Sequence, residues 1–205
     1  GVIVVAKEET YRKFFNNSLT NKYPKIDEFE NLHRFKIDKD WMNDVALHTQ
    51  VTIKNSDICY QHGRILYSTL RQYILDQHYN TDDHINIVET GTARGFSSLC
   101  LAKALNDSGA NGTIHSIDTI PGNKKFYWNC IDDIEGKKTR LELLNKWSKL
   151  YNKYIKFYDG NSIKVLKKLK LERVNFCFLD ASHTYFDVKK EFKIVSKFQL
   201  KGDIV

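Results

Sequence analysis

Two glycines and an acidic residue stand together after a short apolar run in the middle of the sequence. Glu89 lies two positions before Gly91, and Gly95 follows four residues later, within the stretch IVETGTARGFSSLCLAKAL of residues 87–105. Loops that bind dinucleotides have the pattern G-x-G-x-x-G, and this spacing differs from it. Glycines allow a sharp turn and a close approach of the backbone to a ligand. Carboxylates disfavour a diphosphate there and favour a ligand with a positive charge and a diol.

Three further acids stand where apolar runs end. Asp118 and Asp180 end two such runs, and Asp159 directly follows a third run at Tyr158. In open parallel sheets, ligands bind in a crevice outside the carboxyl ends of the strands. The sequence therefore predicts that these three carboxylates and Glu89 line one crevice.

The elements that would position these acids alternate between strand-like and helix-like runs. We expect strands at 85–89, 113–117, 154–158 and 174–179, helices at 97–105, 138–151, 162–169 and 185–198, and the start of another strand at 203–205. Alternation of this kind builds right-handed βαβ units. The predicted fold is therefore α/β and Rossmann-like: a doubly wound, mainly parallel sheet with helices on both faces and an N-terminal helical extension. Ser97 or Ser98 is expected to cap the helix after the glycines.

The N-terminal part of the chain lacks this alternation of strand-like and helix-like runs. Apolar residues recur at helical spacing over 41–51 and 60–79, whereas residues 7–40 have no clean period and predict helix and loop. We therefore divide the chain into an N-terminal helical extension or lid, residues 1–82, and a ligand-binding domain, residues 83–205. The segment Tyr60–Arg64 is a candidate lid or acceptor wall, and fits a helix packed on the sheet edge equally well.

Composition narrows the classes of function. The chain has 205 residues, the length of one ordinary domain, and a net charge of +7, with 25 lysines among its 32 basic residues. The lysines are spread along the sequence, which favours a solvated surface over a nucleic-acid-binding face. No apolar run is long enough to span a membrane and no signal peptide is readable, so we expect a soluble, cytoplasmic protein. The four cysteines lack metal-binding or redox spacing and are expected to be buried free thiols.

At these residues the sequence resembles the class I S-adenosylmethionine-dependent methyltransferases. Their first motif, E-x-G-x-x-x-G, matches residues 89–95, and VNFCFLDASHTY of residues 174–185 is similar to the D-G-x-H-x-Y pattern of small-molecule O-methyltransferases. The closest groups are the macrocin and cephalosporin-hydroxylase-like enzymes of the methyltransferase family 24 type. The resemblance covers residues 85–205.

The resemblance implies a role for each acid. Glu89 would face the amino group of the donor's methionine, Asp118 would hold the ribose hydroxyls, and Asp159 would lie near the adenine. Asp118 follows Gly91 by 27 residues, about the interval expected of a ribose-binding acid. Alternatives are a helix cap for Asp118, a turn for Asp159, and a salt bridge from Glu89 to Arg94 or Arg64. The residues assigned to the donor are Glu89, Gly91, Thr92, Ala93, Gly95, Ser97, Asp118, Asp159, Gly160 and Asp180.

Methyl transfer also needs a nucleophilic acceptor oxygen. A base could take its proton, or a divalent cation could lower its pKa, and Asp180 and His183 stand where either would act. In the resembling groups the aspartate of this motif binds magnesium, together with acids that follow the fifth strand. This sequence stops at Val205, inside that strand, so we expect the chain to be a piece of a longer protein.

The expected activity is methyl transfer to a hydroxyl of a small molecule or sugar. Two alternatives remain: an RNA or other nucleic-acid methyltransferase, and a non-catalytic module that binds S-adenosylmethionine. The first lacks support because the sequence contains neither an N-P-P-[YF] nor a D-P-P-[YF] run. We expect a small hydroxylated acceptor as partner and no membrane contact. The identity of the acceptor and the formation of a homo-oligomer are not readable from the sequence.

Overall fold

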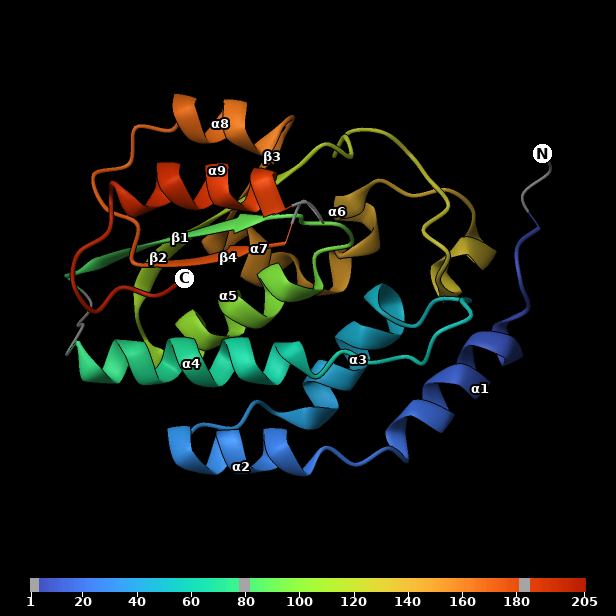
Figure 1. Cartoon of the computed structure of the whole chain (residues 1–205). Helices are drawn as coiled ribbons and strands as arrows, with labels where there is room; N and C mark the ends of the chain where they lie inside the picture. The colour runs from blue at the N-terminus through green and yellow to red at the C-terminus, as the bar shows by residue number, and fades with distance from the viewer. Residues whose placement is uncertain (1–3, 78–81, 181–184) are drawn as a thin grey trace.

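The computed structural model describes residues 4–77, 82–180 and 185–205, and it contains one parallel sheet. The strands are β1 (His84–Thr90), β2 (Asn111–Asp118), β3 (Ile155–Asp159) and β4 (Phe176–Leu179), in the order β3-β2-β1-β4. Each neighbouring pair is parallel. The strands point the same way in Figure 1, so their carboxyl ends share one edge. The predicted doubly wound α/β fold is confirmed.

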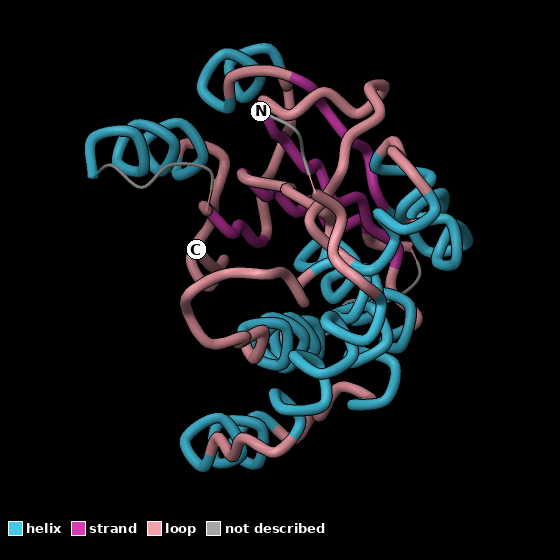
Figure 2. Tube along the Cα trace, turned by 90° about the vertical axis from the view of Figure 1, so that its right-hand side faces the viewer, coloured by secondary structure: helices cyan, strands magenta, loops and turns pink. Residues whose placement is uncertain are grey.

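Helices cover both faces of the sheet. On one side lie α5 (Phe96–Ser108) and α7 (Ser148–Tyr154), with α4 (His62–Asp76) packed against α5. On the other side lie α8 (Ser162–Lys168) and α9 (Tyr185–Ser196) (Figures 1 and 2). This arrangement buries both faces of the strands, as the continuous apolar runs of the sequence require.

The pleat of β1 shows how the strands divide their side chains between two cores. Ile85 and Ile87 join the larger hydrophobic cluster on the α5 side, whereas Val88 joins a smaller cluster on the side of α8 and α9. Successive side chains of a strand point to opposite faces, so this partition follows from the residue order.

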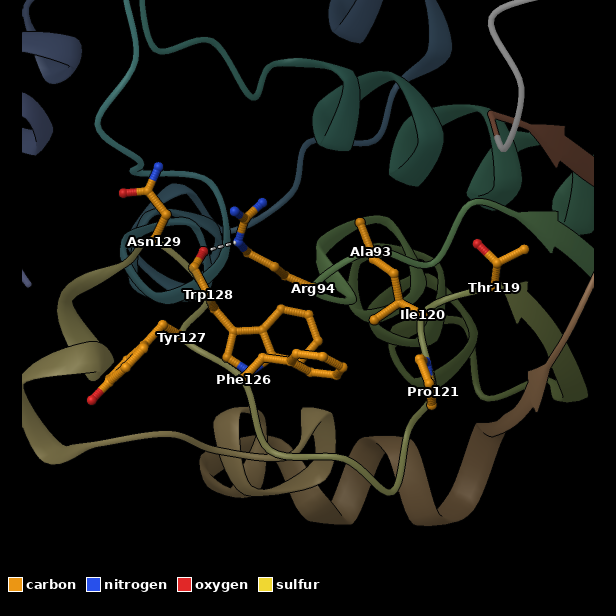
Figure 3. A pocket seen from close by; sticks show the side chains of 9 residues that line it. All are labelled: Ala93, Arg94, Thr119, Ile120, Pro121, Phe126, Tyr127, Trp128 and Asn129. Atoms are coloured by element: carbon orange, nitrogen blue, oxygen red, sulfur yellow. Dashed lines mark hydrogen bonds between the residues drawn. The ribbon is translucent and has the colours of Figure 1, made fainter. Parts of the chain in front are cut away.

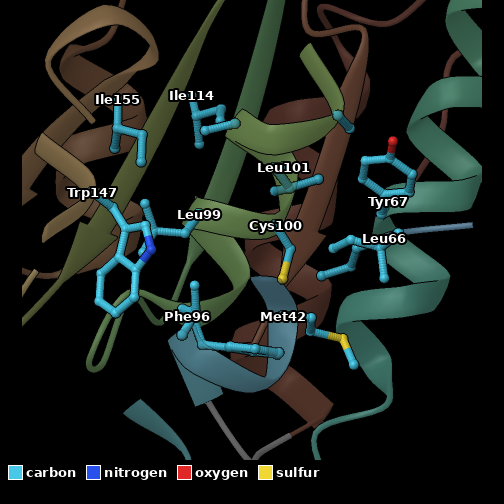
Figure 4. Close-up of a cluster of buried hydrophobic side chains, with 14 of the residues drawn as sticks. Met42, Leu66, Tyr67, Phe96, Leu99, Cys100, Leu101, Ile114, Trp147 and Ile155 are labelled. Atoms are coloured by element: carbon cyan, nitrogen blue, oxygen red, sulfur yellow. The ribbon is translucent and has the colours of Figure 1, made fainter. Parts of the chain in front are cut away.

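Three N-terminal helices precede α4. They are α1 (Glu8–Leu19), α2 (Pro24–His33) and α3 (Lys39–Thr49). The larger cluster includes Met42 of α3 and Leu66 of α4 together with Phe96 and Leu99 of α5 (Figure 4). The N-terminal helices therefore share a hydrophobic core with the sheet. The division of the chain at residue 82 into two units stays a prediction.

The predicted helix over 138–151 is wrong. The chain instead forms the short 3-10 helix η1 (Ile131–Glu135), then α6 (Arg140–Leu143), η2 (Asn145–Trp147) and α7. The side chain of Thr139 accepts a hydrogen bond from the backbone of Glu142 and starts α6 as a capping box. Leu144, between the two short helices, is fully buried against the turn at Gly95. Tertiary packing therefore interrupts the periodic pattern.

Of the strand expected to begin at 203–205, the structure shows an isolated bridge beside β4. Ile204 forms a parallel bridge with Phe176, its carbonyl accepts from the backbone N–H of Cys177 at 2.9 Å, and its N–H donates to Asn175. The backbone of residue 204 thus extends the sheet on the free side of β4.

Two expectations from composition can be compared with the structure. The four cysteines are free thiols, but Cys59 is exposed, against the expectation that it would be buried. No helix in the described ranges is both long and apolar enough to cross a membrane.

Candidate functional site

The carboxyl ends of the four strands lie side by side along one edge of the sheet. Thr90 of β1 pairs with Ile117 of β2 and with Leu179 of β4, and Asp118 pairs with Asp159 of β3. Directly after β4, the N–H of Asp180 donates to the carbonyl of Thr90 at 3.0 Å. The structure thus brings the acids predicted from the sequence to the same edge of the sheet, the edge where ligands of parallel α/β proteins bind.

The loop between β1 and α5 takes its shape from left-handed backbone conformations. Gly91, Ala93 and Gly95 have φ values of 86°, 48° and 97°. The N–H of Gly91 donates to Ile117 at 2.8 Å, which holds the loop against the end of β2. A side chain on Gly95 would place its Cβ 2.6 Å from Leu144, so both conformation and space require glycine there.

The serines after this loop do not cap α5, contrary to expectation. Gly95 is the N-cap, and no side chain caps the helix. Ser98 instead donates to the carboxyl of Glu89, and Thr92 is hydrogen-bonded to Ser116 at 2.6 Å. Ser97 is half-buried. The hydroxyls of this region therefore organise the interior of the site.

Glu89 is fully buried beneath the glycine loop, with no exposed surface. Its Oε2 accepts from Ser98 and from Ser116, the latter at 3.2 Å, and its Oε1 is without a hydrogen-bond partner in the described part of the chain. Burial raises the pKa of Glu89 to about 8, although the two serines lower it. The charges of Asp180 and Asp118 raise this pKa further. Such an unpaired oxygen is a strong site for a hydrogen-bond donor or a cation.

The salt bridge considered for Glu89 is not formed. Arg64 pairs with Glu30 and Asp27, and Arg94 donates its Nε to the carbonyl of Trp128 at 2.7 Å. The carboxyl of Glu89 therefore has no counter-charge among these two candidates.

Asp118 links the two loops that border the crevice. Its Oδ2 accepts from the backbone N–H of Ala93 at 2.6 Å, and its Oδ1 accepts from that of Ile120 at 2.9 Å. Each carboxylate oxygen can accept a second hydrogen bond, so the group retains capacity for the two hydroxyls of a diol. The alternative role as a helix cap is not seen, because Asp118 is followed by a loop.

Asp159 and Gly160 occupy the neighbouring position at the end of β3. The exposed side chain of Asp159 accepts from the N–H of Gly122 at 3.0 Å, and Gly160, at a φ of 135°, donates its N–H to the carbonyl of Asp118 at 2.8 Å. These contacts join the ends of β2 and β3.

Arg140 of α6 is a site residue that sequence reasoning missed. It is almost fully buried and donates to the carbonyls of Ala93 at 2.8 Å and Ile120 at 3.2 Å. Burial lowers the pKa of Arg140, and the charges of Asp118 and Asp159 oppose that shift. Asp118 and Arg140 thus hold the same two peptide segments, one through N–H groups and the other through carbonyls. The helical pattern around residue 140 gave no signal of this role.

Asp180 lies exposed at the end of β4, near His62 at the start of α4. The ring of His62 stacks on Phe178 and meets Phe96 edge-on, with centroids 6.4 and 5.2 Å apart. Burial lowers the pKa of His62, and the charge of Asp180 opposes this shift. His62 falls within the segment that the sequence marked as a candidate acceptor wall. His183, the predicted partner of Asp180, lies outside the described residues.

The predicted magnesium site at Asp180 stays a prediction. Among the described residues, no group of three or more His, Cys, Asp or Glu side chains is placed to hold a metal ion.

A Rossmann-like sheet with a glycine loop, a buried glutamate and an acid at the end of β2 defines the class of nucleoside-binding α/β proteins. Residues 88–203 match the family described as methyltransferase domain, and the chain belongs to that family. The resemblance to class I S-adenosylmethionine-dependent methyltransferases is thereby confirmed. No curated protein matches the sequence.

Several solved structures are similar to this chain. Cofactor-bound Rv0187 from MTB is 15% identical, with a TM-score of 0.50, over 86% of this chain and 69% of that one. The methyltransferase PaMTH1 of Podospora anserina, bound to SAH, is 18% identical, with a TM-score of 0.49, over 100% and 71% of the two chains. A putative caffeoyl-CoA O-methyltransferase from Staphylococcus aureus is 17% identical, with a TM-score of 0.49, over 87% and 69%.

Proposed function

We propose that this chain transfers the methyl group of S-adenosylmethionine to a hydroxyl of a small molecule. The observation that carries the proposal is the buried carboxyl of Glu89, whose Oε1 has no hydrogen-bond partner in the described residues. The donor carries an ammonium group that can supply the missing hydrogen bond and charge. The phosphates of a dinucleotide would supply neither a hydrogen-bond donor nor a positive charge to this oxygen.

The remaining acids account for the rest of the donor. Asp118 accepts the ribose hydroxyls, since its two oxygens each keep an acceptor site beside the backbone N–H groups they already bind. Asp159 and Gly160 lie next to it, where the adenine extends along the ends of β2 and β3. Thr92, Ala93 and the glycines form the loop that passes beneath the donor. These assignments come from the resemblance to the family, and the neighbouring positions of the residues on one edge of the sheet support them.

The transfer is an in-line displacement that needs few protein groups. The bond between the donor's sulfur and its methyl carbon breaks as a bond from the acceptor oxygen to that carbon forms, and the donor leaves as S-adenosylhomocysteine. The protein positions the two reactants, and a base accepts the hydroxyl proton. We assign Asp180 to the acceptor's side of the crevice, with His183 as the base from the sequence motif. The charge of Asp180 acts on the pKa of His62, which it raises against the larger effect of burial. We therefore assign His62 to the acceptor wall.

Transfer to oxygen rests on the similarity of residues 174–185 to small-molecule O-methyltransferases. The donor's role is tested first by calorimetry with S-adenosylhomocysteine. Asp118→Ala should weaken binding by roughly 1–3 kcal/mol, because two charge-assisted hydrogen bonds to the ribose are lost. Leu75→Ala on the exposed face of α4 is the control. Equal affinities of the wild type and Asp118→Ala would refute the ribose assignment.

Turnover with hydroxylated acceptors then separates the alternatives. Release of S-adenosylhomocysteine in the presence of a small hydroxylated compound supports the enzyme, whereas donor binding without turnover of any acceptor class supports a binding module. Methylation of RNA alone would point to the nucleic-acid alternative, and its affinity would fall steeply between about 50 and 200 mM salt.

A further inference from the structure

Lysines occur throughout the sequence, but acids balance them everywhere except in its C-terminal part. Residues 162–201 contain ten basic and four acidic residues, so these 40 residues carry six of the seven net positive charges. The 22 basic and 21 acidic residues elsewhere in the chain nearly cancel. This stretch includes α8 and α9, which lie side by side on the face of the sheet opposite the N-terminal helices (Figure 1). The fold therefore gathers the net charge on one side of the molecule.

The lysines of α8 and α9 stand on the outward sides of the two helices. Leu166 of α8 and Val195 of α9 are buried in the smaller hydrophobic cluster against the sheet. The opposite sides of both helices are left to solvent, and seven lysines there are exposed. They are Lys164, Lys167 and Lys168 of α8, Lys189, Lys190 and Lys193 of α9, and Lys197 directly after α9. We call these seven residues the lysine face.

Little counter-charge accompanies the lysine face. Six of its lysines, all except Lys189, form no ion pair or side-chain hydrogen bond within the described residues. Of the four acids in the stretch, Asp180 lies at the crevice and Glu191 is fully buried. The other two are Asp187, half-buried in α9, and Glu172, in the loop between α8 and β4. The lysine face therefore carries a strong positive potential.

The stability of the helices does not explain these positions. A positive charge is favourable in the last turn of a helix, where Lys167 and Lys168 of α8 stand, but unfavourable in the first turn, where Lys164 stands. Lys189 and Lys193 of α9 are four positions apart, as are Lys164 and Lys168, and like charges at this spacing repel each other. A bound anionic partner would offset this repulsion.

The positive charge does not serve the crevice of the proposed donor site. Among the described residues that line the pocket beside this crevice, Arg94 is the one basic residue, and its Nε donates to the carbonyl of Trp128 (Figure 3). The ends of the strands there carry acids instead, Asp118 and Asp159 among them. The lysine face thus requires a partner other than the donor.

Two large apolar side chains are exposed beside the lysines. Phe192, between Lys190 and Lys193 in the sequence of α9, is 45% exposed, and Leu200, after α9, is 62% exposed. Aromatic side chains of this kind bind at the headgroup level of a bilayer when basic residues surround them. An anionic lipid surface therefore matches both the charge and the apolar residues of this side.

The choice of lysine also favours a lipid surface over a nucleic acid. Arginine binds phosphates through a planar fork and stacks on bases, whereas lysine acts as a point charge that imposes little geometry on its partner. All seven residues of the lysine face are lysines. Clusters of about four to eight basic residues on amphipathic helices are typical of binding to anionic lipids.

We propose that the lysine face binds the surface of a bilayer that contains anionic phospholipids, with Phe192 at the level of the headgroups. Such a peripheral contact needs no spanning helix, and none is found in the described ranges. It departs from the expectation of no membrane contact, which rested on the lack of a spanning run. The contact does not depend on the proposed methyl transfer.

Cosedimentation with lipid vesicles tests the contact. Vesicles of phosphatidylcholine alone are compared with vesicles that contain about 30% phosphatidylserine. We expect the wild type to bind the anionic vesicles at least about tenfold more tightly than the neutral ones at about 0.1 M salt. Binding should be largely lost at about 1 M salt, where the Debye length falls from roughly 10 to 3 Å.

Two triple variants remove charge from the lysine face, one from each helix, so that the test does not depend on the folding of a single variant. A third triple variant removes the same charge from exposed lysines of the N-terminal helices and the turn between them, and is the matched control. The α8 variant combines Lys164→Gln, Lys167→Gln and Lys168→Gln, the α9 variant combines Lys190→Gln, Lys193→Gln and Lys197→Gln, and the control combines Lys13→Gln, Lys22→Gln and Lys25→Gln.

The α8 and α9 variants should each bind the anionic vesicles at least about tenfold more weakly than the wild type, since each lysine near an anionic surface contributes about fivefold. The control should lose less than about threefold, because screening limits the effect of distant charges. Phe192→Ala should also weaken binding, whereas Leu32→Ala, at a residue of α2 that is 73% exposed, should not. Urea denaturation confirms that each variant is folded.

Equal binding of neutral and anionic vesicles to the wild type overturns the proposal, as does an equal loss in the control and in the α8 and α9 variants. Binding to polyuridylate that both lysine-face variants lose, with vesicle binding unchanged, also overturns it and gives the face to a nucleic acid. Equal effects of Phe192→Ala and Leu32→Ala overturn the placement of Phe192 at the headgroups.

Discussion

At the residue scale, the burial of Glu89 lowers the free energy of unfolding at neutral pH, and we attribute this cost to a role in donor binding. Its pKa is raised from 4.5 to about 8 in the folded chain, chiefly by burial. As pH rises from 4.5 to 8, the unfolded chain therefore loses this proton while the folded chain keeps it. The free energy of unfolding then falls across that interval, which is the sign expected for an acid whose pKa is raised by folding. A buried carboxyl retained against this cost indicates a binding role.

The same pKa makes donor binding depend on pH. Below pH 8 the empty site holds Glu89 in its protonated form. The donor's ammonium favours the carboxylate, so binding at pH 6 or 7 must release a proton. Affinity for S-adenosylhomocysteine should therefore rise between pH 6 and 8, by up to about tenfold per pH unit. Calorimetry at pH 6, 7 and 8 measures the slope, and buffers of different ionisation enthalpy report the released proton.

Glu89→Gln is the control for this pH dependence. It keeps the size of the side chain and removes its titration, so binding should be weaker and nearly independent of pH over the same range. A wild-type affinity that stays constant from pH 6 to 8 would contradict the role of Glu89.

Sequence reasoning reached some of these residues and not others. Glu89, Asp118 and Asp159 could be found because each stands at the end of an apolar run, where the fold places ligand-binding groups. Arg140 could not, because its contacts with Ala93 and Ile120 join segments 47 and 20 positions away. No local pattern records contacts between segments so far apart.

At the scale of elements, short helices and loops fit together around the glycine turn. Leu144, between α6 and α7, fills the space that a side chain at Gly95 would occupy. This contact also explains why a helix over 138–151 was predicted wrongly. The periodic pattern of that segment describes which residues are buried, and their burial occurs in several short turns instead of one helix. By contrast, the long runs of α4, α5 and α9 were predicted close to their observed bounds, because each forms one continuous helix.

Gly95 should be intolerant of alanine. Its φ of 97° is unfavourable for other residues, and the new Cβ would lie 2.6 Å from Leu144. Gly109, at the other end of α5, has a φ of 65° with nothing within 4 Å of its Cβ position, so Gly109→Ala is a matched control. We expect Gly109→Ala to cost about 1 kcal/mol and Gly95→Ala roughly 1–3 kcal/mol more, because overpacking adds to backbone strain. Urea denaturation measures both, and equal losses would contradict the packing argument.

At the scale of the whole molecule, the N-terminal helices form one further layer on the α4 side of the sheet (Figure 1). Alongside the shared hydrophobic cluster, a charged contact closes this layer. Arg64 of α4 and Glu30 of α2 are 3% and 1% exposed, and the Nε of Arg64 donates to Oε1 of Glu30 at 3.0 Å. Asp27, at the rim, also pairs with Arg64. The start of α4 also carries His62, so this pair supports the acceptor wall of the proposed site.

Breaking the Arg64–Glu30 pair from one side should therefore destabilise the whole molecule. Arg64→Met leaves the buried carboxyl of Glu30 without its cation, and we expect a loss of about 3–5 kcal/mol in the free energy of unfolding. The double variant Arg64→Met with Glu30→Gln removes both charges and should recover much of this loss. Arg12→Met is the control, because its pair with Glu8 on α1 is exposed and should contribute less than about 1 kcal/mol. Urea denaturation of the wild type, Arg64→Met, Glu30→Gln, the double variant and Arg12→Met tests the cycle. If the double variant is as unstable as the sum of the two single variants, the pair does not join α2 to α4 as a unit, and the hydrophobic cluster alone holds the helical layer to the sheet.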